Sequence, residues 1–159
     1  MLLTALGMQL STFMELFVRF LYDSEGHASE FPLTLHMMTF IDAEFFAAAL
    51  LISYGAVIGR ATPVRLVGIM LSECFFYSIN KVVVVLGELH AEDVGGTLTI
   101  HLFGAYFGVA LSKGLGSQDL TTASNADARR FSDLMSLIGT TVLWIFWPRY
   151  VNYTQVLYA

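Results

Sequence analysis

Hydrophobic residues in this 159-residue chain fall into five long runs, separated by stretches of polar residues. The runs cover residues 1–22, 37–59, 64–86, 95–115 and 134–147, and Pro63 stands directly before the third. A membrane-spanning helix needs about 20 consecutive apolar residues. The last run is shorter than that, so we expect its helix to begin before Leu134. The pattern predicts an all-α, polytopic transmembrane bundle of about five spans.

The longest polar connection covers residues 116–132 and is rich in Ser, Asp, Ala and Arg. It predicts a loop inside one transmembrane domain that includes all of residues 1–159. The apolar run at residues 1–22 lacks a positively charged start and a small-x-small cleavage site, so it favours a helix over a signal peptide. We expect this helix to be part of a longer segment that starts before Met1.

Composition supports a membrane protein, because 56% of the residues are hydrophobic and only 13% are charged. Soluble domains carry about 25% charged residues. The net charge of −5 provides no basic surface for nucleic acid. The single cysteine, Cys74, excludes an intramolecular disulfide and a cysteine-based metal cluster. No nucleophile–base pair or phosphate-binding loop is present, so we expect neither an enzyme nor a cofactor or metal site.

The distribution of charge predicts the orientation of the chain in its membrane. The basic residues of the loops gather in alternate connections: Arg60, Arg65, Lys113, Arg129 and Arg130. The loops at residues 23–36 and 88–93 carry acids and no Lys or Arg. Positive loops face the cytoplasm, which places the acidic loops outside the cell. We expect the membrane to be the plasma membrane. Asn152, which begins an Asn-Tyr-Thr glycosylation sequon, is then also outside.

Four ionisable residues near the outer ends of the first two runs suggest polar contacts there. Glu15 and Arg19 are four residues apart on one predicted helix, which favours a local ion pair. Asp42 and Glu44 lie in the outer turns of the second span, where they could face an external vestibule. Ionisable side chains within spans usually face the bundle interior or a water-filled path.

Glu73 and Lys81 lie eight residues apart on the third run. This spacing separates them by about 80° around a helix, so they do not pair easily with each other. We expect each to meet a group on another span.

Two pairs of glycines, Gly55 with Gly59 and Gly104 with Gly108, have the small-xxx-small spacing that allows close helix approach in membranes. Either pair alone could equally be glycines that a membrane helix tolerates at random. Together, on adjoining spans, they predict a tightly packed bundle.

His101 is the most informative single residue. It lies six positions after Gly95, about 9 Å along a helix, in a span with no other ionisable group. A neutral imidazole donates from one nitrogen and accepts with the other, which suits a narrow path for a small polar molecule. The alternative is a core histidine bonded to a carbonyl of a neighbouring helix.

Three other positions at span ends have alternative roles. Asp93 directly precedes Val94-Gly95-Gly96, which predicts an N-cap of the fourth span. Phe45 and Tyr150 lie near outer ends, where aromatic faces could hold a cation. An aromatic belt at the membrane interface is the commoner explanation for such residues.

Residues 93–108, Asp-Val-Gly-Gly-Thr-Leu-Thr-Ile-His-Leu-Phe-Gly-Ala-Tyr-Phe-Gly, resemble the signature on the fifth core helix of the Rh glycoprotein branch of the ammonium transporter family. Residues 43–45 and 53–63 are similar to the third core helix and the loop after it. Residues 138–148 resemble the sixth helix, and residues 2–22 the second. The resemblance covers nearly the whole chain.

The resemblance implies a fold of eleven or more helices, of which this chain carries core helices two to six. It implies a trimer with one pore in each subunit, either a homotrimer or a hetero-oligomer with Rh-like subunits. The implied mechanism recruits ammonium outside, removes a proton and passes neutral ammonia along pore histidines. It also admits carbon dioxide as a second permeant.

By position, His101 matches the first of two pore histidines, and Phe45 matches the external phenylalanine gate. Asp93 matches the acid at the head of helix five, and Trp147 the tryptophan near the outer end of helix six. Tyr150 stands where relatives have a second gate phenylalanine. The second pore histidine is expected in later helices, beyond this chain.

Lys81 is a departure from this pattern, because the family carries an acid at the matching position.

Two other hypotheses stand beside a partial ammonia channel. One is a non-conducting, structural Rh-like subunit that acts only in assembly. The other is a truncated, inactive copy in which polar groups such as Glu73 and Lys81 face lipid.

Overall fold

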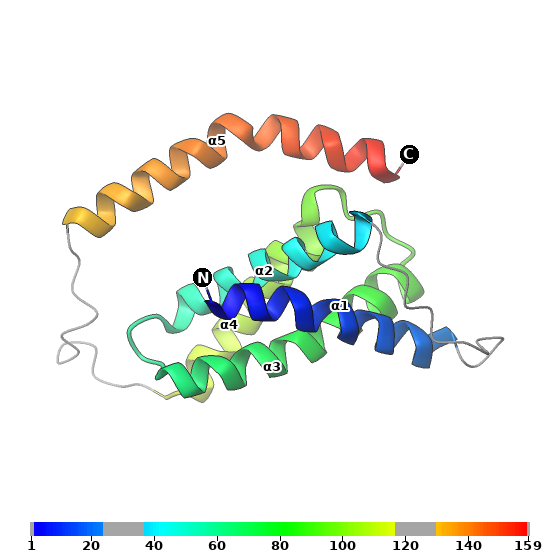
Figure 1. The fold of residues 1–159 in the computed structure, drawn as a ribbon, viewed down its shortest axis with the longest axis horizontal. Coiled ribbons are helices and arrows are strands. Elements are labelled where there is room, and N and C mark those ends of the chain that lie inside the picture. Colours follow the sequence, from blue (N-terminus) through cyan, green and yellow to red (C-terminus); the bar gives the residue numbers. More distant parts are fainter. Residues whose placement is uncertain (1, 24–36, 117–129, 159) are drawn as a thin grey trace.

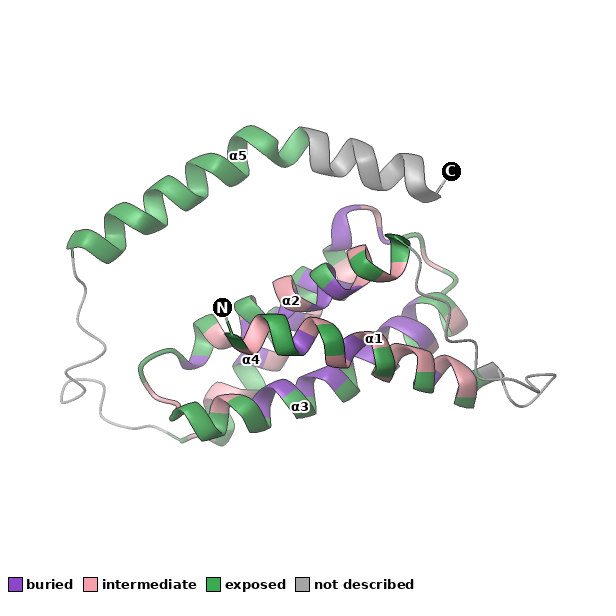
Figure 2. Ribbon diagram, viewed as in Figure 1, coloured by how far each residue is buried: buried purple, intermediate pink, exposed green. Residues whose placement is uncertain are grey.

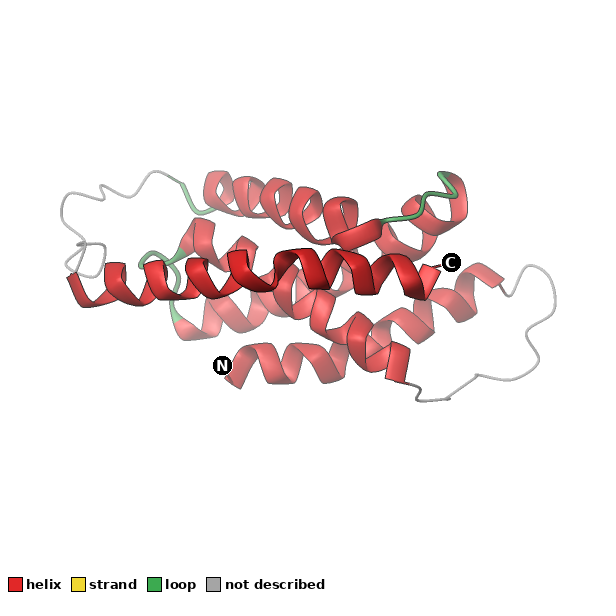
Figure 3. Ribbon diagram, turned by 90° about the horizontal axis from the view of Figure 1, so that it is seen from above, coloured by secondary structure: helices red, strands yellow, loops and turns green. Residues whose placement is uncertain are grey.

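The computed structural model describes residues 2–23, 37–116 and 130–158, with side chains described as far as Pro148. In this part of the chain the helices are joined by short loops, and there is no strand (Figure 3). The elements in order are α1 Leu2–Asp23, α2 Met37–Val57, α3 Pro63–Ile79, η1 Asn80–Glu88, η2 Val94–Gly96, η3 Thr97–Leu102, α4 Phe103–Gly114 and α5 Arg130–Tyr158. The predicted all-α class is confirmed.

The helices depart from the predicted runs at three places. The third span continues from α3 into the π-helix η1, and the fourth is built from η2, the π-helix η3 and α4. The second helix ends at Val57 and not at Gly59, because Gly59 takes a left-handed φ of 76° that stops the helix. The last helix begins at Arg130, so the connection predicted over 116–132 ends earlier; residues 117–129 lie outside the described part.

Four helical segments among the described residues are long and apolar enough to cross a membrane: Met37–Val57, Pro63–Glu88, Val94–Gly114 and Arg130–Pro148. The helix α1 has 22 residues but is not among them. It carries Gln9, Glu15 and Arg19, which lower its hydropathy. Large apolar side chains are exposed on the outside of the bundle, such as Val64 at 82% and Ile58 at 79%. Such a surface is suited to lipid as its solvent.

The helix α2 lies at the centre of the bundle and packs against α1 and α4, while α1 also packs against α3 (Figure 1). The core forms where these helices meet: Phe45, Phe46, Ala49, Leu50, Met70, Cys74, Tyr77 and Ile100. At its middle, the rings of Phe46 and Tyr77 meet edge to face, with centroids 5.2 Å apart. Figure 2 shows that the buried residues lie mainly on α2, α3 and η1 to η3, whereas the described part of α5 is exposed.

One of the two predicted glycine motifs makes a close helix contact. A Cβ atom on Gly104 would lie 2.9 Å from the Ala49 carbonyl oxygen, and one on Gly108 would lie 3.0 Å from the Ala56 Cβ atom. The absence of side chains at these two positions therefore lets α4 approach α2. At Gly55, by contrast, an added Cβ atom would meet nothing within 4 Å among the described residues.

The loop between α2 and α3 is tied to the end of α4. The Arg60 guanidinium donates to the Ser112 hydroxyl at 2.9 Å and to the backbone carbonyl of Gly116. Thr62 caps α3, its side chain accepting from the Arg65 backbone N–H, and Pro63 occupies the first turn. The connection that carries Arg60 and Arg65 and the end of α4 that carries Lys113 therefore lie at the same end of the bundle.

The helix α5 runs along one side of the bundle and contacts it at η2 (Figure 1). All of its described side chains are exposed (Figure 2). The described part of α5 therefore lies on the surface of the molecule and contributes no residue to its core.

Candidate functional site

A cavity of about 550 Å³ lies between α2, η3 and α5. Three residues singled out in the sequence line it, one from each element: Phe45, His101 and Trp147. The remaining lining residues are Glu44, Ala48, Leu51, Ile52, Ile100, Leu143 and Phe146. The wall is therefore mostly apolar, with a few polar groups, as is usual for small-molecule sites.

His101 presents its imidazole to this cavity. Its ring centroid lies 5.8 Å from that of Trp147, with the ring planes at 55°. The side chain is exposed, and neither nitrogen hydrogen-bonds to any residue that the structure describes. The alternative of a core histidine bonded to a neighbouring carbonyl is not found in this part of the chain. One nitrogen can donate to a bound molecule and the other can accept.

A sharp backbone turn sets the start of the helix that carries His101. Gly95 and Gly96 have φ values of 78° and 71°, in the left-handed region that favours glycine. A side chain on Gly96 would also overlap Ile100. The π-helix η3 then begins at Thr97, and π-turns of this kind occur often at functional sites.

Asp93 caps this π-helix. One carboxylate oxygen accepts from the Leu98 N–H at 2.8 Å, and the other accepts from the Thr99 N–H and hydroxyl, both at 2.7 Å. Asp93 stands directly before η2, as the predicted N-cap would, but its side chain makes no capping hydrogen bond to η2. Its carboxylate accepts instead from backbone N–H groups in the first turn of η3. Asp93 does not line the cavity; it holds the backbone of the helix that carries His101.

Phe45 and Trp147 line the cavity from two different helices, α2 and α5. Phe45 is 7% exposed and belongs to the core, so its position is fixed by the packing of α2. Trp147 is 44% exposed and stands directly before Pro148 on α5. The predicted residues Tyr150 and Asn152 belong to α5, but their side chains lie outside the described part of the chain.

A group of charged residues from three helices lies near the end of α1. The Lys81 ammonium is 2.8 Å from an Asp42 carboxylate oxygen and 3.0 Å from a Glu15 carboxylate oxygen. The other Glu15 oxygen is 2.8 Å from the Arg19 guanidinium. The predicted Glu15–Arg19 pair is confirmed, and so is the expectation that Lys81 meets groups on other spans.

Glu73 also meets another span, as predicted. Its side chain is completely buried, and one carboxyl oxygen lies 2.6 Å from the Ser53 hydroxyl oxygen. That hydroxyl oxygen is also 3.0 Å from the Gly104 carbonyl oxygen. A hydroxyl has one hydrogen, so both contacts are satisfied when Ser53 donates to Gly104 and a protonated Glu73 donates to Ser53.

Two residues have roles that the sequence did not predict. Ser53 enters the sequence argument only as part of the family resemblance, although a small polar residue inside an apolar run is a signal for an interhelical hydrogen bond. The sequence placed Glu44 in an external vestibule, and it lies on the wall of the cavity beside Phe45.

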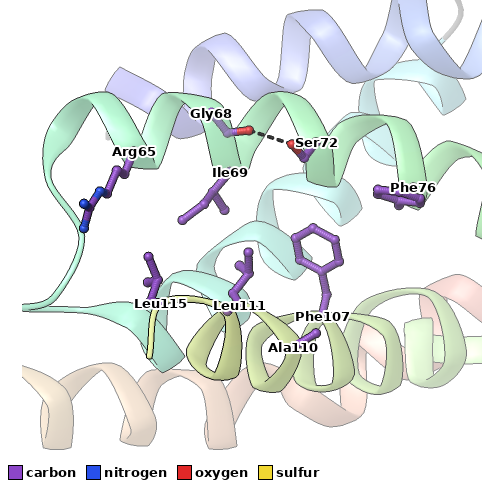
Figure 4. Close-up of a pocket in the computed structure, with 10 residues that line it drawn as sticks. Arg65, Gly68, Ile69, Ser72, Phe76, Phe107, Ala110, Leu111 and Leu115 are labelled. Atoms are coloured by element: carbon purple, nitrogen blue, oxygen red, sulfur yellow. Dashed lines mark hydrogen bonds between the residues drawn. The ribbon is translucent and has the colours of Figure 1, made fainter. Parts of the chain in front are cut away.

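A second hollow, of about 640 Å³, lies between α3 and α4 (Figure 4). Its wall is apolar apart from Arg65 at one end and Ser72, whose hydroxyl donates to the Gly68 carbonyl at 2.9 Å. It contains none of the predicted site residues. Among the residues that the structure describes, no group of three His, Cys, Asp or Glu side chains could hold a metal ion. The cavity beside His101 is therefore the candidate site.

The spans, the apolar exterior and the histidine-containing cavity define a multi-pass integral membrane protein. A sequence model of the Ammonium Transporter Family matches residues 3–153, and the chain belongs to this family. The family is one of membrane transporters and not a class of enzyme.

Curated relatives confirm the resemblance to the Rh branch. Ammonium transporter Rh type B-B of Xenopus laevis is 37% identical over 150 residues, which are 94% of this chain and 31% of that protein. Ammonium transporter Rh type B of Pongo pygmaeus is 38% identical over 149 residues, 94% of this chain and 30% of its own length. Ammonium transporter Rh type B of Bos taurus is 44% identical over 115 residues, which are 72% of this chain and 25% of that protein. The chain thus spans less than a third of the length of these relatives.

Proposed function

We propose that this protein conducts ammonium nitrogen across a membrane as neutral ammonia, along a path that passes His101. The observation that carries the proposal is the meeting of Phe45, His101 and Trp147 around one mostly apolar cavity. They come from three separate elements, and the imidazole has no hydrogen-bond partner among the described residues. Membership of the ammonium transporter family supports the same substrate.

The geometry suits ammonia better than ammonium inside the cavity. An isolated charge is heavily penalised in apolar surroundings, so ammonium would lose a proton before it enters. Neutral ammonia can accept a hydrogen bond from one imidazole nitrogen and donate to the other. Carbon dioxide, which is small and neutral, is a second candidate permeant for the same apolar path.

We propose that the acidic end of the bundle faces outside and the basic end faces the cytoplasm, in the plasma membrane. The contact of Arg60 with Ser112 and Gly116 supports this orientation, because it joins two basic connections at one end. Asp93 and the Glu15–Asp42 region then lie outside, on the side from which ammonium would enter. Asn152 would be available for glycosylation on that side.

The proposed assembly is a homotrimer or a hetero-oligomer with Rh-like subunits, with one path in each conducting subunit. Further helices, including a second pore histidine, would complete the path around His101. The wall of α5, exposed along its described length, is consistent with such additional contacts.

The test is uptake of labelled methylammonium by cells that express the protein from its own gene. His101→Ala should reduce uptake at least tenfold, whereas His90→Ala, an exposed histidine outside the cavity, should leave it unchanged. Equal uptake by both variants would contradict a path past His101.

A non-conducting structural subunit and an inactive copy are the alternatives. The inactive copy requires polar groups such as Glu73 and Lys81 to face lipid, and both are instead buried with partners. This observation favours a functional bundle. A structural subunit would show no flux as the pure protein but would be needed for surface expression of Rh-like partners.

A further inference from the structure

Lys81 carries a buried positive charge that the proposed conduction path does not use. The residue is 6% exposed, and its ammonium lies between two carboxylates on other helices, Glu15 on α1 and Asp42 on α2. Arg19 holds the second oxygen of Glu15 at 2.8 Å. The four charges sum to zero.

The contacts are those of an alkylammonium ion held by a receptor. Distances of 2.8 Å and 3.0 Å from nitrogen to oxygen are ordinary for charge-assisted hydrogen bonds. An ammonium group has N–H donors pointing in several directions, so it can bridge carboxylates that belong to different helices. The Asp42 side chain is 26% exposed, which leaves an approach for a small ion from outside the bundle.

We propose that Glu15 and Asp42 form a binding site for a small primary ammonium ion, and that the side chain of Lys81 permanently occupies it. Lys81 is then a specificity-determining residue, because it prevents these two acids from collecting cations from solution. Recruitment of ammonium would depend on other groups, such as Glu44. The inference does not rest on conduction, since its test measures binding and stability.

The test is chemical rescue of Lys81→Ala in the protein produced from its own gene and purified in detergent. The substitution leaves two partly buried carboxylates without their shared partner, which should lower the unfolding midpoint by roughly 10 °C. Methylammonium chloride should refill the site and raise the midpoint by roughly 3–6 °C at about ten times its dissociation constant. Tetramethylammonium chloride at the same ionic strength has no N–H donor and should not.

Two controls identify the site of rescue. In the wild-type protein the two salts should act alike, because Lys81 already fills the site. In the variant Glu15→Gln/Asp42→Asn/Lys81→Ala neither carboxylate remains, and Arg19, which loses its Glu15 partner, is 42% exposed to solvent. This variant should therefore fold without methylammonium and gain nothing from it. Equal effects of the two salts on Lys81→Ala would overturn the proposal. It would also fail if methylammonium stabilised the triple variant, which lacks both acids, but did not stabilise Lys81→Ala.

A measurement on the wild-type protein does not depend on any variant folding. The chain has two lysines, Lys81 and Lys113, and Lys113 is exposed at the other end of the bundle. Reductive methylation followed by mass spectrometry should modify Lys113 at least tenfold faster than Lys81. Equal rates would show that the Lys81 amine is not held by the two acids, and the proposal would fail.

Discussion

The imidazole of His101 and the indole of Trp147 lie with ring centroids 5.8 Å apart and ring planes at 55°, although one residue belongs to η3 and the other to α5. This contact joins α5 to the candidate site, and the described part of α5 has no buried residue. The position of α5 and the shape of the cavity are therefore linked.

Trp147→Leu should loosen this link. Loss of an aromatic pair costs about 0.5–1.5 kcal/mol, and the wider cavity should admit larger amines. We expect uptake of ethylammonium relative to methylammonium to rise roughly tenfold, because one methylene in a hydrophobic pocket changes discrimination by about 10–200-fold. The control is Trp144→Leu, because Trp144 is 80% exposed and does not line the cavity. An unchanged ratio in Trp147→Leu would show that this indole does not limit the path.

Gly104→Leu should destabilise the bundle, because a Cβ atom there would already lie 2.9 Å from the Ala49 carbonyl oxygen. Overpacking of this kind costs about 1–3 kcal/mol or more. Gly55→Leu meets open space among the described residues and should change stability by less than about 0.5 kcal/mol. Thermal unfolding of both variants in detergent measures the difference. Similar midpoints would contradict the close contact of α4 with α2.

Glu73 should be a neutral carboxylic acid that donates to Ser53. Infrared spectra of the purified protein should show the carbonyl stretch of a protonated acid, and Glu73→Gln should remove that band. The amide that this substitution introduces can still donate to the Ser53 hydroxyl, so the variant should fold nearly as well. Ser53→Ala leaves Glu73 and the Gly104 carbonyl without their shared partner and should cost about 1–3 kcal/mol. A spectrum that Glu73→Gln does not alter would argue for an ionised Glu73.

Asp93→Ala should damage the candidate site, although Asp93 does not line the cavity. The variant loses three hydrogen bonds at the start of η3, and a lost N-cap costs about 0.5–2 kcal/mol. Since η3 carries His101, methylammonium uptake should fall along with stability. The neighbouring Glu92 is exposed, so Glu92→Ala is a matched control that should behave as wild type. Normal uptake by a stable Asp93→Ala protein would refute this positioning role.

The helices were predictable from sequence because long apolar runs leave few alternatives to a membrane span. Charge spacing also predicted the Glu15–Arg19 pair, since both residues lie on one helix. Asp93 was predicted as a cap at the start of the fourth span, whereas the left-handed turn at Gly95 and Gly96 was not predicted.

Contacts between helices were harder to predict from the sequence than the helices themselves, because they depend on the rotation of each helix about its axis. The sequence predicted that Lys81 meets another span, but not that Asp42 and Glu15 share its ammonium. It could not distinguish the packed motif at Gly104 from the open one at Gly55, since both have the same spacing. The π-helices η1 and η3 also left no clear pattern, because they differ from α-helices only in hydrogen-bond register.

The most direct test of the central claim is the ammonia permeability of proteoliposomes that contain only this protein. An inward ammonia gradient should make the lumen alkaline faster than in protein-free liposomes, as followed by a trapped pH dye in a stopped-flow instrument. The increment should disappear in His101→Ala and persist in His90→Ala. If wild-type proteoliposomes respond no faster than empty ones, the protein is not a conductor by itself, and a structural role in assembly would replace the account given above.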